Sequence, residues 1–322
     1  MFFRQRSVLA IEQKQPGMKK KTPWDSGTMC GQKGRVVVVT GAAGGLGYEV
    51  SRVFAEKGAR VVMAVRNPQK GVQMAAMIRD MHESSDVEVM ALDLADLSSV
   101  RAFSDTFHKQ YSRLDILVNN AGVMACPYGK TADGFELQFG TNHLGHFALT
   151  LLLMDLIRRV PGGRVVTVSS LAHSFGSLDF DDLNWQKRRY SKWQAYGDSK
   201  LANLYFMQEL QRRFEGKQLP LLAAAAHPGW AATGLQRHEG WLFPLNVIFA
   251  QSAAMGALPV LYAASASDVK GGEFYGPDGM WGMRGYPAKA QPNIRSKDMR
   301  AAELLWDVSE EFTGVQWQNL GG

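Results

Sequence analysis

Short runs of apolar, often β-branched residues alternate with amphipathic segments along most of the 322-residue chain. The clearest runs are "RVVVVT" (35–40), "RVVMAV" (60–65), "VEVMAL" (87–92), "DILVNN" (115–120) and "RVVTVS" (164–169), with weaker ones at 221–226 and 272–275. Helical patterns separate them, at 46–57, 68–83, 97–112, 134–159, 193–215 and 299–311. Uniformly apolar strands are typical of a sheet covered on both faces. The order therefore predicts one α/β domain: a Rossmann-type, doubly wound, seven-stranded and mostly parallel sheet with helices on both faces.

The composition is that of a folded globular protein, with 46% hydrophobic and 20% charged residues. Much of the excess positive charge, +6 overall, lies in "RQR" and "KKK" near the N-terminus. This predicts a flexible basic extension over 1–34, one folded domain over 35–316 and a short tail over 317–322. No specific nucleic-acid site is expected, although binding of nucleic acid by the extension is an alternative.

Only two cysteines occur, Cys30 and Cys126, so the sequence has neither a disulfide framework nor metal-ligand spacing. A reducing, cytoplasmic location without a metal site is expected. The most apolar window, 241–262, contains Pro244 and Pro259 and predicts a buried loop followed by a helix. No transmembrane segment is expected, and peripheral contact of this window with a membrane is an open alternative.

A glycine-rich stretch, "TGAAGGLGYEVSRVF", follows the first strand and leads into a helix. Gly41, Gly45 and Gly47 let the backbone turn tightly and approach a pyrophosphate, and the helix offers free N–H groups at its start. Because the stretch lies between an apolar strand and an amphipathic helix, it predicts dinucleotide binding.

The end of the second strand, "MAVRN", indicates which dinucleotide is bound. Binders of the unphosphorylated cofactor place an acidic residue there to accept from the ribose 2′-hydroxyl. Val65 accepts nothing, whereas the Arg66 guanidinium suits a 2′-phosphate. NADP(H) is therefore preferred over NAD(H). Gly44 provides no hydroxyl for that phosphate, so the preference depends mainly on Arg66.

Two tyrosines stand six residues apart in "RRYSKWQAYGDSKLAN". Tyr196 has Lys200 four residues on, hence on the same helical face, while Tyr190 has no such partner. A nearby ammonium favours the phenolate and lowers the tyrosine pKa. Such a pair is also common in ordinary packing. Ser169 and Ser170 end a strand at the sheet edge where open α/β sheets bind ligands, which favours catalysis.

The chain resembles the short-chain dehydrogenase/reductase family. The family's patterns occur in order over about residues 35–316, as "TGAAGGLG", "NNAG", "YGDSK" and "PGWAAT". "NHLGHF", "TADGFE", "SSLAH" and "AAELLWDVSEE" resemble its retinol dehydrogenase-like branch, which includes WW-domain oxidoreductases. Pairing as a homodimer or homotetramer through the helices at 97–112 and 134–159 is a further expectation from the resemblance.

The resemblance implies a catalytic tetrad. Tyr196 would be the general acid/base, Lys200 would bind the nicotinamide ribose and depress the tyrosine pKa, Ser170 would hold the carbonyl oxygen, and Asn142 would anchor a helix bend. Besides Tyr196, Lys200 and Arg66, the implied cofactor contacts are Gly41, Gly45, Leu46, Gly47, Asp93, Leu94, Asn119, Ala121, Gly122, Pro228, Gly229 and Thr233.

The segment after "HPGWAATG" is rich in large apolar residues, which favours a hydrophobic carbonyl or alcohol as substrate. The leading hypothesis is an NADP(H)-dependent oxidoreductase that interconverts the two. Two alternatives stay open: a cofactor-binding regulatory or scaffold protein with little turnover, and a double-bond reductase similar to protochlorophyllide reductase.

Overall fold

One sheet of eight described strands forms the centre of the computed structural model, which describes residues 23–230 and 251–317. The strand order is β3-β2-β1-β4-β5-β6-β7-β8. The strands are β1 (Val36–Thr40), β2 (Arg60–Val65), β3 (Asp86–Ala91), β4 (Ile116–Asn119), β5 (Arg164–Val168), β6 (Leu222–Ala226), β7 (Phe274–Gly279) and β8 (Arg284–Lys289). The first seven pair in parallel, which confirms the predicted doubly wound α/β fold.

The eighth strand is the one departure from the expected seven. It pairs antiparallel with β7 at the edge of the sheet, with Pro287 opposite Pro277. Its sequence, "RGYPAK", contains a glycine, a proline and two cations, and none of its residues is fully buried. Proline is tolerated at a sheet edge because its missing N–H faces outward. A strand that buries so little lacks the apolar pattern by which strands are predicted.

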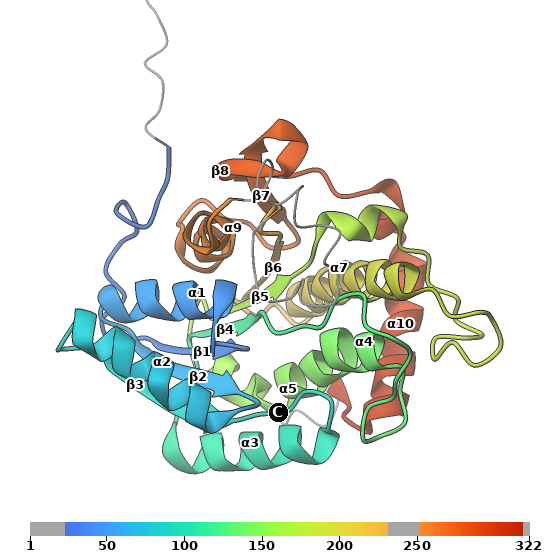
Figure 1. The fold of residues 1–322 in the computed structure, drawn as a ribbon, viewed down its shortest axis with the longest axis horizontal. Coiled ribbons are helices and arrows are strands. Elements are labelled where there is room, and N and C mark those ends of the chain that lie inside the picture. The colour runs from blue at the N-terminus through green and yellow to red at the C-terminus, as the bar shows by residue number, and fades with distance from the viewer. Residues whose placement is uncertain (1–22, 231–250, 318–322) are drawn as a thin grey trace, which may run out of the picture.

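Helices cover both faces of the sheet, as Figure 1 shows. They are α1 (Gly45–Glu56), α2 (Pro68–Met81), α3 (Leu97–Gln110), α4 (Leu137–Phe139), α5 (Gly145–Leu152), α6 (Met154–Arg158), α7 (Lys192–Gly216), α9 (Ala253–Ser265) and α10 (Met299–Thr313). Shorter turns are the π-helical η1 (Gly140–Leu144) and the 3₁₀ turns η2 (Leu171–Phe175), η5 (Met280–Gly282) and η6 (Ile294–Lys297).

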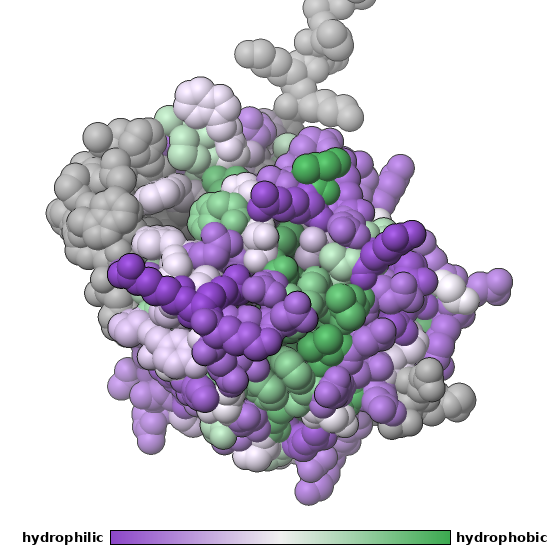
Figure 2. All heavy atoms as spheres, turned by 90° about the vertical axis from the view of Figure 1, so that its right-hand side faces the viewer, coloured by the Kyte–Doolittle hydropathy of each residue, from purple (hydrophilic) through white to green (hydrophobic). Residues whose placement is uncertain are grey.

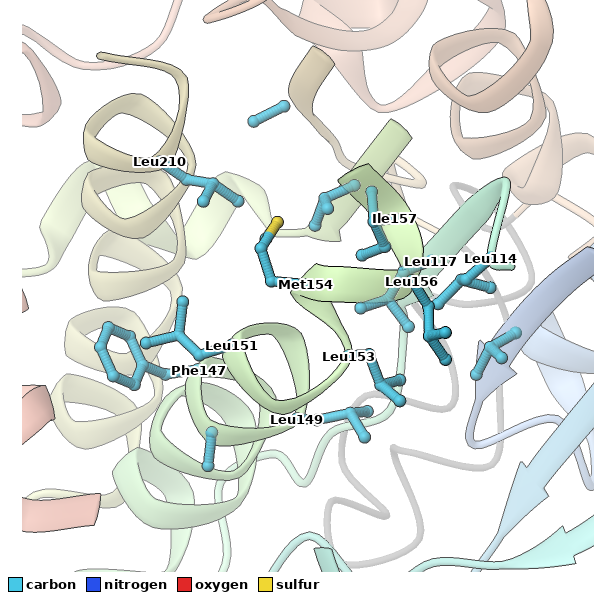
Figure 3. Packing of buried hydrophobic residues seen from close by; sticks show 14 of the residues in the cluster. Leu114, Leu117, Phe147, Leu149, Leu151, Leu153, Met154, Leu156, Ile157 and Leu210 are labelled. Carbon is cyan, nitrogen blue, oxygen red and sulfur yellow. The ribbon is translucent and has the colours of Figure 1, made fainter. Parts of the chain in front are cut away.

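Two buried clusters, one on each face, hold these layers together. The first joins α1, α2 and α9 to the sheet. The second joins α3, α5, α6, α7 and α10 to the other face. Figure 3 shows part of this second cluster, where Phe147, Leu151 and Met154 point toward Leu210 of α7. Burial of this apolar surface is the main term that stabilises the layers, at roughly 25 cal/mol per Å².

The expected long helix over 134–159 is divided into α4, η1, α5 and α6. Gly140 and Gly145 lie at the ends of the π-helical turn, where neighbouring segments come very close. A Cβ at Gly145 would lie 2.4 Å from the Leu94 oxygen, and one at Gly140 would lie 2.4 Å from the Thr131 methyl carbon. Hydrophobic periodicity reports the buried face of a helix but not such local changes in its winding.

The C-terminal helix α10 covers part of the surface that was expected to pair with a second subunit. Trp306 of α10 packs edge-on against Phe147 of α5 at 5.0 Å and stacks on Phe206 of α7 at 5.9 Å between ring centroids. Figure 2 views the molecule from this side, where a band of hydrophobic side chains runs between hydrophilic ones. That part of α5 is thus occupied within the chain, and pairing of subunits stays a prediction.

The apolar window at 241–262 is described only from residue 251 onward. Its second half forms α9, which begins after the N-cap Ser252 and contains Pro259, as expected for a buried helix. At the other end of the chain, Trp24 packs edge-on against Tyr262 of α9 at 5.2 Å between ring centroids. In the two described segments, no helix combines the length and the apolar character needed to cross a bilayer.

Candidate active site

A cavity of about 710 Å³ opens at the carboxyl ends of the central strands. The strand order reverses between β1 and β4, and open α/β sheets bind ligands at such a switch point. Fourteen predicted site residues line the cavity: Gly41, Gly45, Leu46, Gly47, Arg66, Asp93, Leu94, Ala121, Gly122, Ser170, Tyr196, Lys200, Pro228 and Gly229. Two others, Asn119 and Asn142, do not line it, and Thr233 lies outside the described residues.

The glycine loop after β1 forms a tightly packed cradle. Gly41 has a left-handed backbone (φ +67°), and a Cβ there would lie 2.9 Å from the Ala121 Cα. A Cβ at Gly47 would lie 2.5 Å from the Asn120 Nδ2 and 2.6 Å from the Gly41 oxygen. Neither position has room for a side chain, so the loop presents backbone to the cavity.

The donors of this cradle match a pyrophosphate. Gly44 is the N-cap of α1 and makes no side-chain cap hydrogen bond, and the first turn of the helix carries no acidic residue. The first N–H groups of the helix therefore have no side-chain acceptor at the cap, and the dipole of the helix favours an anion. The residues present fit a dinucleotide phosphate.

Of the two neighbouring asparagines at the end of β4, one lies in the core and the other lines the cavity. Asn119 is fully buried and donates through Nδ2 to the Thr150 hydroxyl at 2.9 Å. Asn120 lines the cavity and donates through its Nδ2 to the Thr40 carbonyl at 2.7 Å. The Asn119 side chain therefore lies behind the cavity wall, and its contact with a cofactor stays a prediction. Because side chains alternate along a strand, adjacent residues face opposite sides, and only the register decides which faces the cavity.

Where β2 and β3 end, the cavity wall contains more than Arg66, the single cation that the sequence indicated. Arg66 follows β2 and Asp93 follows β3, as predicted, and the buried Val65 precedes the arginine. Asn67 and Lys70 line the cavity as well, and neither was predicted from the sequence. Asn67 is the N-cap of α2 and Lys70 lies in its first turn. The signal for them was the short connection: α2 begins three residues after β2 ends, so its start lies at the same edge of the sheet as Arg66.

The catalytic candidates come together on α7 and after β5. The helix begins after Ser191, whose hydroxyl accepts from the Gln194 N–H. Tyr196, about one turn further on, and Lys200, about two turns further on, both line the cavity. The Lys200 Nζ lies 5.7 Å from the centroid of the Tyr196 ring and donates to the Val168 carbonyl at 3.2 Å. Ser170 caps η2 by accepting from the Ala172 N–H.

Burial controls the titration of this pair. It raises the pKa of Tyr196 to about 12, and the Ser170 hydroxyl beside the phenol acts weakly in the opposite direction. Burial also lowers the pKa of Lys200 to about 8. The sequence led us to expect that the ammonium would depress the tyrosine pKa, but desolvation is the larger effect here. At neutral pH, Tyr196 is therefore a protonated phenol and Lys200 is mostly an ammonium.

Asn142 does not line the cavity but hydrogen-bonds to residues that form its wall. It lies in the π-helical turn η1, is fully buried, and accepts from the Val123 N–H at 2.8 Å. Its Nδ2 donates to the Val123 carbonyl and to the Ser199 hydroxyl, each at 2.9 Å. A Cβ at Gly122 would lie 3.0 Å from its Oδ1. Asn142 thereby ties the lining segment after β4 to the catalytic helix.

Tyr190 does not reach the cavity. Its hydroxyl donates to the buried Glu136 carboxylate at 2.9 Å and accepts from the Gln138 Nε2 at 2.8 Å. Gln138 also donates to the carbonyl of Lys192, the first residue of α7. Tyr190 thus belongs to a hydrogen-bond cluster beside the start of α7 and is not part of the cavity wall.

The two histidines of η1 and α5 are also structural. His143 bonds to the Ser309 hydroxyl and His146 to the Thr40 hydroxyl, and burial lowers the pKa of each. Among the residues that the structure describes, no group of three His, Cys, Asp or Glu side chains could hold a metal ion.

The remaining cavity wall is largely apolar. It is formed by η2, the start of α7, the loop after β6 and the turn between β7 and β8. Its members are Leu171, Ala172, Phe175, Trp193, Trp230 and Met283. The Trp230 N–H donates to the Met283 carbonyl at 2.8 Å, which joins the last two segments. The wall of the cavity therefore combines a glycine-rich part and an apolar part with the hydroxyl groups of Tyr196 and Ser170.

Comparison with known proteins agrees with this arrangement. A family model described as "short chain dehydrogenase" matches residues 35–240. The chain belongs to the short-chain dehydrogenase family. This short-chain dehydrogenase is 43% identical over 291 residues to retinol dehydrogenase 12 of Mus musculus, covering 88% of each chain. It is 39% identical over 295 residues to retinol dehydrogenase 13 of Homo sapiens, covering 88% of this chain and 86% of the relative.

Solved structures show the same fold. An uncharacterized protein from Mycobacterium paratuberculosis is 45% identical to this short-chain dehydrogenase, with a TM-score of 0.79, and the match covers 92% of this chain and 99% of the other. A short-chain dehydrogenase of Shigella flexneri, solved in complex with NADP, is 24% identical with a TM-score of 0.60. That match covers 75% of this chain and 96% of the other and supports the fold alone.

Proposed function

We propose that this protein uses NADP(H) to interconvert a hydrophobic aldehyde or ketone and the corresponding alcohol. One observation carries the proposal: a single cavity joins the glycine cradle, the Tyr196–Ser170 pair and an apolar wall. A cofactor held by the cradle and a substrate held by the wall would meet at the phenol.

The chemistry follows from the protonation states of the lining residues. The bound cofactor would supply or accept a hydride at the substrate carbon. During reduction, the Tyr196 phenol donates its proton to the carbonyl oxygen, which the Ser170 hydroxyl holds in place. The resulting phenolate is stabilised by the Lys200 ammonium on the same helical face. In the oxidation direction the proton returns from the alcohol to the phenolate.

The raised pKa of Tyr196 favours the reductive direction. With a pKa of about 12, the phenol is almost entirely protonated at neutral pH, so the form that donates a proton in reduction predominates and the phenolate that oxidation requires is scarce. Lys200, with a pKa of about 8, still carries its charge at pH 7. Asn142 supports both residues by fixing the Val123 backbone and the Ser199 hydroxyl on either side of them.

The preference for NADP(H) rests on the end of β2. Val65 is buried and offers no acceptor for a ribose 2′-hydroxyl, and Arg66 is an exposed cation on the cavity wall. A guanidinium binds a phosphate through paired, charge-assisted hydrogen bonds.

The apolar wall and the names of the relatives support a lipophilic substrate. Phe175, Trp193, Trp230 and Met283 offer mostly apolar surface, which suits an alkyl or ring system. The relatives above are named retinol dehydrogenases, so a retinoid is one candidate. Steroids, alkyl aldehydes and aromatic ketones are the other candidates of the same hydrophobic class.

The test is cofactor oxidation with a panel of carbonyls. Purified protein is mixed with NADPH or NADH and with retinal, a long alkyl aldehyde, an aromatic ketone, a keto steroid and a short polar aldehyde. We expect NADPH to be oxidised with at least one hydrophobic carbonyl, more slowly with the polar aldehyde, and more slowly with NADH in place of NADPH. Oxidation of neither cofactor across the panel would overturn the proposal and favour a binding role.

A further inference from the structure

We propose that His173 is a positioning residue for Ser170: its imidazole holds the serine backbone from behind the cavity wall and joins it to the chain after β8. This role rests on the proposed function, because Ser170 is the group that would hold the substrate oxygen. Every other residue of η2 lines the cavity, whereas His173 does not and is only 3% exposed. The histidine can therefore influence a substrate only through another residue.

Ser170 needs an anchor because it lies just beyond the sheet. The register between β5 and β6 ends with Val168 opposite Ala226, and the Ser169 N–H still donates to the Ala226 carbonyl at 2.8 Å. Ser170 follows with extended backbone (φ −153°, ψ 160°), and its hydroxyl accepts from the Ala172 N–H at 3.2 Å. The position of that hydroxyl therefore depends on contacts outside the strand ladder.

The two ring nitrogens of His173 supply such a contact. The Asn293 backbone N–H donates to the Nε2 at 3.1 Å, and the Nδ1 lies 2.5 Å from the Ser170 carbonyl oxygen. A backbone N–H can only donate and a carbonyl can only accept, so the Nε2 is the acceptor and the Nδ1 carries the hydrogen. One neutral tautomer satisfies both contacts, and burial favours it by lowering the pKa of His173.

The imidazole is itself held in place by two segments that are distant in the sequence. It packs edge-on against Phe274 of β7, with 5.3 Å between ring centroids and 84° between ring planes. Asn293, which follows β8, also donates through its Nδ2 to the Ser174 carbonyl at 3.0 Å. The ring thus links a fixed point after β8 to the Ser170 carbonyl, which also accepts from the His173 backbone N–H at 3.1 Å.

The test exchanges the imidazole for side chains that keep one of its hydrogen bonds or neither. His173→Asn places an amide NH₂ near the position of the Nδ1 and can still donate to the Ser170 carbonyl. His173→Gln reaches the position of the Nε2 and can accept from the Asn293 N–H, but it loses the bond to Ser170. His173→Phe keeps an aromatic ring and loses both bonds.

Tyr205→Phe is the matched control. It removes a hydrogen bond from the Tyr205 hydroxyl to the Arg295 carbonyl, in the same segment after β8, and Tyr205 does not line the cavity. Circular dichroism establishes that each variant is folded. Steady-state reduction of a carbonyl by NADPH gives kcat, and calorimetry gives NADPH affinity separately.

We expect His173→Phe and His173→Gln to lower kcat by about ten- to hundredfold, the scale of a small displacement of a positioned group. NADPH affinity should stay within about twofold, and so should kcat for Tyr205→Phe. His173→Asn should recover most of the lost kcat, because it keeps the bond to the serine backbone. A purely structural histidine would not separate the asparagine variant from the glutamine variant.

Ser170→Ala provides a second, independent arm. If His173 acts through the serine hydroxyl, adding His173→Phe to Ser170→Ala should lower the single-turnover rate by no more than about a further twofold. Losses that multiply, equal kcat values for His173→Asn and His173→Gln, or wild-type kcat for His173→Phe would each overturn the role of His173 alone. A wild type that reduces no carbonyl would overturn the proposed function, and this role with it.

Discussion

Two lysines line the same cavity under opposite conditions. Lys200 is 4% exposed, donates to a strand carbonyl, and has its pKa lowered to about 8 by burial. Lys70 is exposed on the first turn of a surface helix, with no side-chain partner in the described part of the chain. The buried cation is held in a position that costs free energy, as expected of a group that takes part in chemistry. The exposed cation stays solvated, so its charge costs little free energy to maintain.

The largest effect should come from removing the buried charge. Lys200→Met keeps the length of the side chain and removes the ammonium that stabilises the phenolate, so we expect turnover to fall at least about a hundredfold. The same change should raise the free energy of unfolding of the cofactor-free protein at pH 7 by up to about 3 kcal/mol, because a desolvated charge is gone. Steady-state kinetics and urea unfolding measure the two effects. A variant that is both active and less stable would contradict the account of Lys200.

The stability gain should depend on pH. The pKa of Lys200 is about 8 in the folded protein, against 10.5 for an ordinary solvated lysine, so the unfolded chain binds more protons between these values. The destabilising effect of Lys200 is therefore full below pH 8 and is lost as the pH rises toward about 10.5. Urea unfolding of the wild type and Lys200→Met should converge over this range. A constant difference between them would show that the lysine does not titrate in this window.

A smaller effect should follow from crowding the buried lysine while leaving its charge in place. A Cβ added in Gly122→Ala would lie 3.0 Å from the Asn142 Oδ1 and 3.5 Å from the Lys200 Nζ. We expect turnover to fall about tenfold from a shift of these groups, the equivalent of roughly 1.4 kcal/mol. Binding of adenosine 2′,5′-bisphosphate should stay unchanged in calorimetry. A loss of both would mean that the two ends of the cavity are coupled.

The smallest effect should be that of Lys70 on stability. Because the side chain is exposed and unpaired, Lys70→Ala should change the free energy of unfolding by no more than about 0.5 kcal/mol. Urea unfolding at pH 7 measures it, and the control is Lys109→Ala, which changes an exposed lysine at the end of α3. A decrease of more than about 1 kcal/mol in the free energy of unfolding would show that Lys70 is structural and would remove the contrast between the two residues.

The sequence alone predicted those features in which local geometry requires a particular type of residue. The apolar runs predicted seven strands of the sheet, because buried parallel strands have few other options. The glycine cradle and the Tyr196–Lys200 spacing were likewise readable, since both lie within one turn or one helix. In each case the residues that must cooperate are neighbours in the chain.

The features that the sequence did not predict depend on contacts between distant segments of the chain. The orientation of Asn119 is set by the register of β4 in the sheet, and the edge strand β8 buries too little to show an apolar pattern. Lys70 became visible as a lining residue only once α2 had been placed beside Gly44. The pKa of Tyr196 could not be inferred from its lysine, because the deciding influence is burial by several segments together.

The central claim, that Tyr196 is the acid, is tested most directly by replacing each of the two tyrosines with phenylalanine. Tyr190→Phe is the matched control, because it removes the same hydroxyl from a residue outside the cavity wall. With NADPH and a carbonyl substrate in single-turnover stopped flow, we expect Tyr196→Phe to slow reduction by about 10²- to 10⁴-fold with NADPH binding retained. Tyr190→Phe should stay close to the wild type. Wild-type rates for Tyr196→Phe would contradict the account.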